Sequence, residues 1–412
     1  FNFMKVYLDY SATTPVDPAV YRAMKPYFSQ VFGNPASLHS YGQAAQAAVD
    51  QSRQVVADFL GAQPQEIIFT SGATESDNLA IMGLIAGLKA DNFSVRPHII
   101  VSSIEHDAVR QPARQLEQLG IEVSWLPVNS RGIVEVSSVE RLIKPNTILV
   151  SVIYVNSETG ARQPIREIGE LLKKINKTRE AAQPHIGTDS ARRLPHIYFH
   201  TDATQAINYF DCHVDHLHCD LLSFSGHKIY GPKGIGVLYS RSGTPLKSIQ
   251  LGGHQENNRR SGTLNVPGIV GLSKALELVA DQQVEEIKRI SGLRQRLVDG
   301  LIHQVPGVVV NTDLSQASPA HAHISIMRVE GESVLLALDL VGIAVSTGSA
   351  CAAGNLEASS TLLAMGITPE ISHYSLRFSL GRWTTSAEID YVLEQLPPIV
   401  QRLSHLSANL TI

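Results

Sequence analysis

Residues 147–155 are the sequence feature that most restricts the fold of this chain. They are almost entirely apolar, which is typical of a parallel strand covered on both faces. Short apolar segments and amphipathic stretches alternate around them. The predicted strands are 66–70, 98–102, 121–126, 147–155 and 197–201, and the predicted helices are 44–60, 74–88, 105–119 and 165–175. This alternation predicts an α/β domain with a doubly wound, mainly parallel sheet.

The order of elements changes after Pro267, where a long predicted helix runs to about Gln304. Strands near 308 and at 323–329, a helix from Glu332 and a last helix from about Ser386 follow it. This pattern predicts a smaller α+β domain, with the boundary near 265–270. Residues 176–195 are polar and rich in turn residues, so we expect them to form an inserted surface loop.

Composition excludes several classes of protein. The 412 residues are 43% apolar and 17% charged, which fits a globular enzyme of two or three domains. A net charge of −4 gives no basic excess for nucleic acid, and no apolar run reaches the roughly 18 residues of a membrane span. Residues 1–5 are too short and mixed for a signal peptide, and those ahead of Met4 are expected to be a cloning remnant or a trimmed end.

The cysteine count indicates where the protein works. Cys212, Cys219 and Cys351 make an odd number in a large chain, which argues against a disulfide framework. We therefore expect a reducing compartment and a cytoplasmic location. The His- and Cys-rich segment 211–220 resembles a metal site, but its two cysteines are six residues apart and no second pair exists. We expect no metal there.

Lys228 lies between two short segments, 219–222 and 235–239, that read as buried strands. A lysine held on such a connection can have its pKa lowered and can attack a carbonyl to form a Schiff base. On local sequence alone, an exposed lysine in a hairpin turn is an equal alternative.

Two further features favour the first interpretation. Residues 70–76 follow a strand and begin a helix, so their backbone N–H groups and hydroxyls could bind a phosphate. An ordinary helix N-cap is the alternative. Asp202 ends a predicted strand 26 residues before Lys228, where ligands of open parallel sheets bind. A lysine, an aspartate and a phosphate cup together are what pyridoxal 5'-phosphate requires.

His106 and Cys351 could add chemistry to this site. His106 follows a strand and begins a helix, so it could be an acid/base group that stacks on a ring, or a helix cap. Cys351 lies among small residues that offer little apolar bulk to bury it, which favours a presented thiol over a structural cysteine.

These residues together resemble the cysteine desulfurases of the class V aminotransferase family, pyridoxal-phosphate enzymes of fold type I. The resemblance extends from Tyr7 to Arg382. Its motifs are 7–15, 33–35, 70–76, 202–205, 225–228, 260–263, 348–351 and 377–382. It implies a large cofactor-binding domain of residues 14–266, and a small domain of residues 1–13 and 267–412 that carries the cysteine loop.

The resemblance also implies roles for single residues. Lys228 would form the Schiff base, Asp202 would pair with the pyridinium nitrogen, Gln205 would bond the phenolic oxygen, and His106 would stack on the ring and move protons. The phosphate would be held by Ala73, Thr74, Ser225 and His227, with Thr263 contributed by the other subunit of a homodimer.

Substrate and product follow from the same resemblance. Asn156 and Arg377 would bind the substrate carboxylate, for which a bidentate guanidinium is suited. Cys351 would attack the substrate sulfur, so that L-cysteine becomes L-alanine and a persulfide remains on the enzyme. The persulfide would pass to an acceptor or iron–sulfur scaffold protein, for iron–sulfur cluster assembly or thiolation.

Some features depart from the family pattern and leave alternatives open. Residues 156–160 replace the usual double asparagine followed by Glu-Ile-Gly, although Asn156 is retained. The insertion at 176–195 resembles extra residues in selenocysteine lyases, so selenocysteine remains a candidate substrate. A silent regulatory paralogue would lack Lys228, Cys351 or Arg377, and all are present. An ordinary transaminase would need no presented cysteine.

Overall fold

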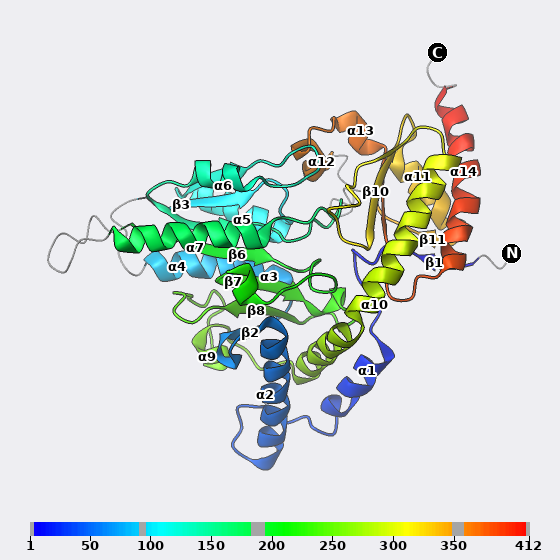
Figure 1. Cartoon of the computed structure of the whole chain (residues 1–412). Coiled ribbons are helices and arrows are strands. Elements are labelled where there is room, and N and C mark those ends of the chain that lie inside the picture. Colours follow the sequence, from blue (N-terminus) through cyan, green and yellow to red (C-terminus); the bar gives the residue numbers. More distant parts are fainter. Residues whose placement is uncertain (1–3, 90–95, 183–193, 348–357, 409–412) are drawn as a thin grey trace.

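The computed structural model describes residues 4–89, 96–182, 194–347 and 358–408 (Figure 1). The strands are β1 (Val6–Tyr7), β2 (Ile67–Thr70), β3 (His98–Ser102), β4 (Glu122–Leu126), β5 (Thr147–Ser151), β6 (Tyr198–Asp202), β7 (Leu221–Ser225), β8 (Gly236–Ser240), β9 (Val308–Val310), β10 (His321–Ile326), β11 (Ile343–Ala344) and β12 (Ser375–Ser379).

The helices cover both sides of these strands. They are α1 (Pro18–Met24), α2 (Ser40–Leu60), α3 (Ala73–Asn78), α4 (Leu84–Lys89), α5 (Asp107–Gln118), α6 (Val136–Leu142), α7 (Ile165–Ala181), α8 (Val214–Leu217), α9 (Gln255–Asn258), α10 (Val266–Gln304), α11 (Gly331–Asp339), α12 (Ser360–Ala364), α13 (Pro369–His373) and α14 (Ser386–Ala408). A π-helical turn, Leu79–Gly83, joins α3 to α4, so the single helix predicted over 74–88 has an irregular middle. No helix in the described ranges is long and apolar enough to span a membrane.

The central sheet of the described residues has seven strands in the order β2-β8-β7-β6-β5-β3-β4. All its neighbouring strands pair in parallel except β8, which is antiparallel to both β2 and β7. The mainly parallel sheet predicted from the apolar segments is therefore confirmed. Every residue of β5 is buried, as its nearly continuous apolar sequence requires. The strand is shorter than predicted, because regular pairing ends at Ser151.

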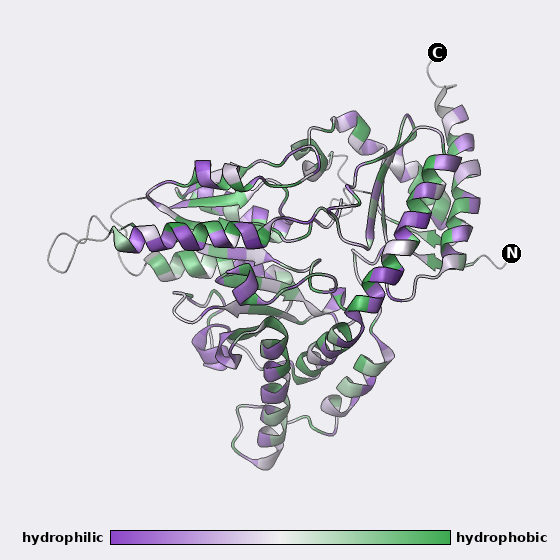
Figure 2. Cartoon of the chain, viewed as in Figure 1, coloured by the Kyte–Doolittle hydropathy of each residue, from purple (hydrophilic) through white to green (hydrophobic). Residues whose placement is uncertain are grey.

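Both faces of the sheet are packed with helices, which explains the continuous apolar strands. Ile67 and Phe69 join a cluster formed with α2, α7 and the first half of α10. Ile68 points to the opposite face, where α4 and α5 cover it. Figure 2 shows hydrophobic colouring on the central strands and hydrophilic colouring along much of the outer helix α7. The result is a three-layer α/β arrangement.

A smaller body is built on the antiparallel sheet β12-β10-β9 and the parallel pair β1-β11. Its buried cluster includes residues of α11 and α14 and the second half of α10. Helix α10 contributes Leu272 and Leu276 to the large cluster, and Leu297 and Leu301 to the small one. The predicted domain limits, 14–266 and 1–13 with 267–412, stay a prediction.

The prediction of a surface loop over 176–195 is wrong in its first part. Helix α7 continues to Ala181, because Asn176 and Arg179 are buried anchors rather than loop residues. Asn176 pairs with both backbone groups of Ile197, at 2.9 Å each. The polar composition of this stretch therefore reflects buried hydrogen bonds as well as exposure. Residues 183–193 lie outside the described ranges.

Candidate active site

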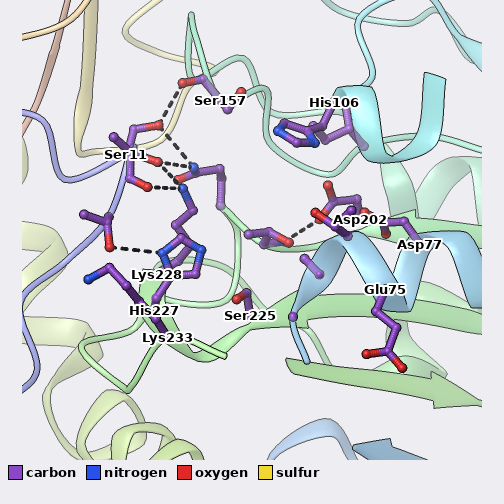
Figure 3. Close-up of a pocket in the computed structure, with 18 of the residues that line it drawn as sticks. Ser11, Glu75, Asp77, His106, Ser157, Asp202, Ser225, His227, Lys228 and Lys233 are labelled. Carbon is purple, nitrogen blue, oxygen red and sulfur yellow. Dashed lines mark hydrogen bonds between the residues drawn. The ribbon is translucent and has the colours of Figure 1, made fainter. Parts of the chain in front are cut away.

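A cavity of about 610 Å³ lies where the carboxyl ends of β6 and β7 meet the start of α3 and the segment Ser11–Thr13 (Figure 3). The carboxyl edge of parallel strands is where ligands bind in such sheets. The predicted site residues that line it are Ala73, Thr74, His106, Asp202, Gln205, Ser225, His227, Lys228 and Arg377. Asn156 and Thr263 do not line it, and Cys351 lies outside the described residues.

Lys228 ends a 3-10 turn, Gly226–Lys228, between the antiparallel strands β7 and β8. The turn is tight, since a Cβ on Gly226 would come within 2.9 Å of the Ile235 side chain. The lysine Nζ donates to the backbone carbonyls of Ser11, at 2.5 Å, and Ala12, at 2.7 Å. The amine is thus held at the cavity, by an N-terminal segment that sequence reasoning did not connect with it.

The same N-terminal segment reaches two other predicted site residues. The Gln205 side chain donates to Ser11 O at 3.0 Å, and the hydroxyl of Thr13 lies 3.1 Å from His227 Nδ1. Burial, followed by the charge of Lys228, lowers the pKa of His227 to about 4. His227 is therefore a neutral imidazole near neutral pH.

The opposite end of the cavity is acidic. Asp202 is the last residue of β6, is 4% exposed, and accepts a hydrogen bond from Thr204 N at 2.9 Å. Asp77 on α3 also lines the cavity and is fully buried. Glu105 is buried just before His106, and burial raises its pKa to about 8. Asp77 and Glu105 were missed, because one acid in a helix and one beside a predicted helix start usually face solvent.

His106 is the N-cap of α5, where its Nδ1 accepts a hydrogen bond from Ala108 N at 3.1 Å. Both readings of this histidine are therefore compatible with its position, since the capping ring also lines the cavity. Capping fixes Nδ1 as an acceptor, which leaves Nε2 as the ring nitrogen that carries the proton. The predicted stacking role requires such a fixed ring.

Arg377 on β12 brings a positive charge to the cavity from the smaller body. Its Nη1 donates to Ser157 O at 3.0 Å, and its Nη2 pairs with Asp9 Oδ1 at 2.8 Å. The Nε atom is buried without a hydrogen-bond partner in the described structure. An arginine fixed through one N–H of each Nη nitrogen keeps one further N–H on each, and a guanidinium that lines the cavity in this way is suited to bind a carboxylate there.

Asn156 is placed differently from its predicted partner Arg377. It is 2% exposed, and its amide donates to Ile104 O at 3.0 Å and to the Thr361 hydroxyl at 3.3 Å. Its Oδ1 accepts from the backbone N–H of Thr159 at 2.9 Å. The side chain is engaged within the protein, and its role toward a substrate stays a prediction.

The cysteines of the His- and Cys-rich segment face the core. Cys212 and Cys219 are both buried, and burial raises the pKa of each thiol well above its usual range. These thiols are protonated at neutral pH and are neither nucleophiles nor good metal ligands.

The comparisons with known proteins agree with this fold and cavity. The family model described as aminotransferase class-V matches residues 6–179 and 184–392. Solved structures with the same architecture include a NifS-like protein, 34% identical with a TM-score of 0.87, which covers 97% of this chain and all of that one. Another is SspA in complex with cysteine, 34% identical with a TM-score of 0.76, covering 93% of this chain and all of that one. The fold and the site therefore define an enzyme of the pyridoxal-phosphate fold type I.

Curated relatives narrow this class. The cysteine desulfurase IscS of Dictyoglomus turgidum is 41% identical over 403 residues, which are 98% of this chain and 96% of the relative. The cysteine desulfurase of Homo sapiens is 42% identical over 405 residues, which are 98% of this chain and 83% of that protein. The chain belongs to the cysteine desulfurases of the class V aminotransferase family, as its motifs predicted.

Proposed function

We propose that this enzyme binds pyridoxal 5'-phosphate in the cavity and converts L-cysteine to L-alanine, with the sulfur carried as a persulfide on Cys351. The observation that carries the proposal is that Lys228, Asp202 and Arg377, from three separate elements, line one cavity. The amine, the buried carboxylate and the guanidinium are the three charged groups that this chemistry requires.

The charges of the cavity fit the cofactor. Lys228 and Lys233 line it, and so do Thr74 and Ser225, which carry hydroxyl groups. Asp202 lies on the acidic side. A flat ligand with a phosphate at one end and a protonated ring nitrogen at the other matches this polarity. When bound, the cofactor supplies an electron sink for the charge left at the substrate α-carbon.

Each predicted residue then has a distinct task. Backbone and side-chain donors of Ala73, Thr74, Ser225 and neutral His227 bind the phosphate, where the N-terminal end of α3 adds its dipole. Asp202 pairs with the ring nitrogen. Gln205, oriented by Ser11, donates to the phenolic oxygen, and the capped ring of His106 stacks on the cofactor.

Lys228 would hold the cofactor through its aldehyde, and as an amine it would move the α-proton of the substrate. The carbonyls of Ser11 and Ala12, which hold this amine in the structure, keep it at the cavity. Arg377 orients the substrate by its carboxylate, together with the predicted Asn156. Cys351 forms a sulfur–sulfur bond with the substrate as the carbon–sulfur bond breaks. An acceptor or iron–sulfur scaffold protein removes the sulfur.

A homodimer is part of this proposal, because Thr263 lies away from the cavity of its own chain. Large apolar side chains are exposed on and around α1 and α2, among them Phe28 at 62%, Phe32 at 63% and Leu38 at 92%. Burying such a surface against a second copy would stabilise the pair. The cytoplasmic location also stays a prediction.

The test follows alanine and sulfide release from L-cysteine with a thiol reductant, with L-selenocysteine run in parallel. We expect cysteine turnover that is lost in Cys351→Ala, although this variant keeps its cofactor and its yellow colour. Lys228→Ala should be folded and colourless. Turnover confined to selenocysteine would make the enzyme a selenocysteine lyase, and unchanged turnover in Cys351→Ser would indicate a transaminase-type reaction.

A further inference from the structure

The acidic side of the cavity holds more carboxyl groups than the proposed function uses. Asp77 from α3, Glu105 from the segment before α5, and Asp202 from the end of β6 are 0%, 4% and 4% exposed. Asp77 and Asp202 both line the cavity and lie beside one another in Figure 3. Only Asp202 has a task in the proposed chemistry. The role of Asp77 is therefore open.

The surroundings of Asp77 do not stabilise a negative charge. Neither carboxyl oxygen makes a hydrogen bond of normal geometry within the described structure. His200 Nε2 lies 3.5 Å away, but burial lowers the pKa of this histidine to about 3, so it is a neutral imidazole. Its ring nitrogens lie 2.8 Å from the Ser151 hydroxyl and 3.1 Å from that of Ser223.

Asp202 and Glu105, in contrast, each accept hydrogen bonds. Asp202 Oδ1 accepts from Thr204 N at 2.9 Å. Glu105 Oε1 accepts from Ile153 N at 2.6 Å and from the Ser102 hydroxyl. Donors favour the ionised form of a carboxyl group, and neighbouring buried carboxylates cannot all ionise. Of the pair that lines the cavity, Asp77 is the one that accepts no hydrogen bond of normal geometry, so it is the natural holder of a proton.

We propose that Asp77 is a positioning residue that carries a proton on its carboxyl group, so that the negative charge at the cavity floor stays on Asp202. The assignment of Asp202 to the ring nitrogen rests on the proposed function. An ionised Asp77 would draw a proton onto Asp202 and remove the anion that a cationic ligand nitrogen needs. A neutral Asp77 preserves it.

The titration of Asp77 depends on every group that faces it. Burial raises its pKa most, the charge of Asp202 raises it further, and Glu105 adds to this rise when it ionises near pH 8. The hydroxyl of Ser223 on β7 acts in the opposite direction and is outweighed. The base His200, 3.5 Å away, is neutral, and the other bases that line the same cavity are His106, Lys228, Lys233, His227 and Arg377.

The direct test is infrared spectroscopy of the full-length enzyme loaded with pyridoxal phosphate. A protonated carboxylic acid has a C=O band that is separate from carboxylate and amide bands and shifts in D₂O. We expect this band near neutral pH to contain one component that Asp77→Asn removes and a second that Glu105→Gln removes. Asp202→Asn should leave the first component in place.

Cofactor binding gives an independent readout. The neutral amide of Asp77→Asn mimics a neutral acid, so its dissociation constant for pyridoxal phosphate should stay within about threefold of the parent. Asp202→Asn loses a charge-assisted hydrogen bond and should bind the cofactor at least about tenfold more weakly. The exposed helix residue Asp299, changed to Asn, is the matched control for both measurements.

A band unchanged in Asp77→Asn, or a band that Asp202→Asn removes at every pH at which the protein is folded, would place the proton elsewhere and overturn the proposal. Tenfold weaker cofactor binding in Asp77→Asn would do the same, because it would mean that the charge of Asp77 is used. If Asp77→Asn does not fold, the Asp202→Asn spectrum still tests whether Asp202 holds the proton. Because these readouts are not activities, failure to turn over cysteine would refute the proposed function alone.

Discussion

The guanidinium of Arg377 is held by Asp9 before any substrate arrives. The 2.8 Å contact joins side chains that are only 6% and 20% exposed, so solvent screens it weakly. With Nη1 and Nη2 each used once, the fork of the arginine has one orientation. Asp9 therefore fixes the angle of the guanidinium, which we propose binds the substrate carboxylate.

Removing this contact should weaken substrate binding more than turnover. In Asp9→Ala the guanidinium can rotate, and we expect KM for L-cysteine to rise about tenfold, with kcat within about twofold. Asp9→Asn keeps an acceptor for Nη2 and should stay within about threefold of the parent. Steady-state kinetics of both variants checks this, with the exposed Asp299→Asn as control. Equal KM values for all three would contradict it.

Glu105 should make the stability of the protein depend on pH. Its pKa is raised from 4.5 to about 8, mainly by burial, so the folded chain keeps a proton that the unfolded chain has lost. The free energy of unfolding should therefore fall as pH rises from about 4.5 to 8. Asp77 contributes in the same direction.

Glu105→Gln should reduce this fall by on the order of 1–3 kcal/mol between pH 5 and pH 8. The measurement is urea unfolding of the full chain at several pH values. Glu117→Gln, on the exposed face of α5, should leave the pH dependence unchanged. If the free energy of unfolding of Glu105→Gln depended on pH in the same way as that of the parent, this carboxyl group would be ionised in the folded state.

The sequence predicts a single site residue where the residue lies at the end of a strand or in a turn between strands. Lys228 and Asp202 could be found because strand ends and turns are visible in the apolar pattern. Asp9 could not, because its partner Arg377 is 368 residues away and only the folded chain joins them. Asp77 could not, because a carboxyl group in a helix gives no sign of which face it occupies.

At the scale of elements, helix α7 shows how buried polar residues stabilise the sheet. Arg179 donates to the carbonyls of Thr147 at 2.9 Å, Pro195 at 2.7 Å and Lys144 at 2.7 Å. It thereby connects α7 to the start of β5 and to the segment that enters β6. The apolar pattern predicted the helix only to residue 175, because a polar last turn has the composition of a loop.

We expect Arg179→Ala to lower the free energy of unfolding by about 2–4 kcal/mol, because three carbonyls lose their shared donor. Lys177→Ala, an exposed change on the same turn, should stay within about 0.5 kcal/mol of the parent. Thermal or urea unfolding measures both. Equal stability of the two variants would mean that water replaces the guanidinium.

For the whole molecule, the mainly parallel sheet follows the predicted alternation of elements, while the assembly state is a separate question. Thr263 provides the test, because its predicted target is the cavity of another copy. Mixed dimers can be made by co-expressing Lys228→Ala and Thr263→Ala chains. In such a dimer, one cavity combines an intact Lys228 with an intact Thr263 from the partner.

If Thr263 acts on the partner, mixed dimers should have about half of the activity of the unaltered enzyme. The Lys228→Ala and Thr263→Ala homodimers should both be impaired. If it acts on its own chain, no intact site forms and activity does not recover. Desulfurase turnover of purified mixed dimers, with the two chains carrying different affinity tags, decides between these outcomes. A mixed dimer of one Lys228→Ala chain and one unaltered chain gives the activity expected of a dimer with one intact site.

The pairing of β1 with β11 has a consequence for the order of events during synthesis. Val6 pairs with Ile343, and Ser11, whose carbonyl holds Lys228, donates its N–H to the hydroxyl of Ser379. The beginning of the chain can therefore take its place only after its last quarter has left the ribosome. The seven-stranded sheet can form earlier, but Lys228 and Arg377 come together in the cavity only at the end of synthesis. A nascent or truncated chain thus cannot release sulfide in the cell before the enzyme is complete.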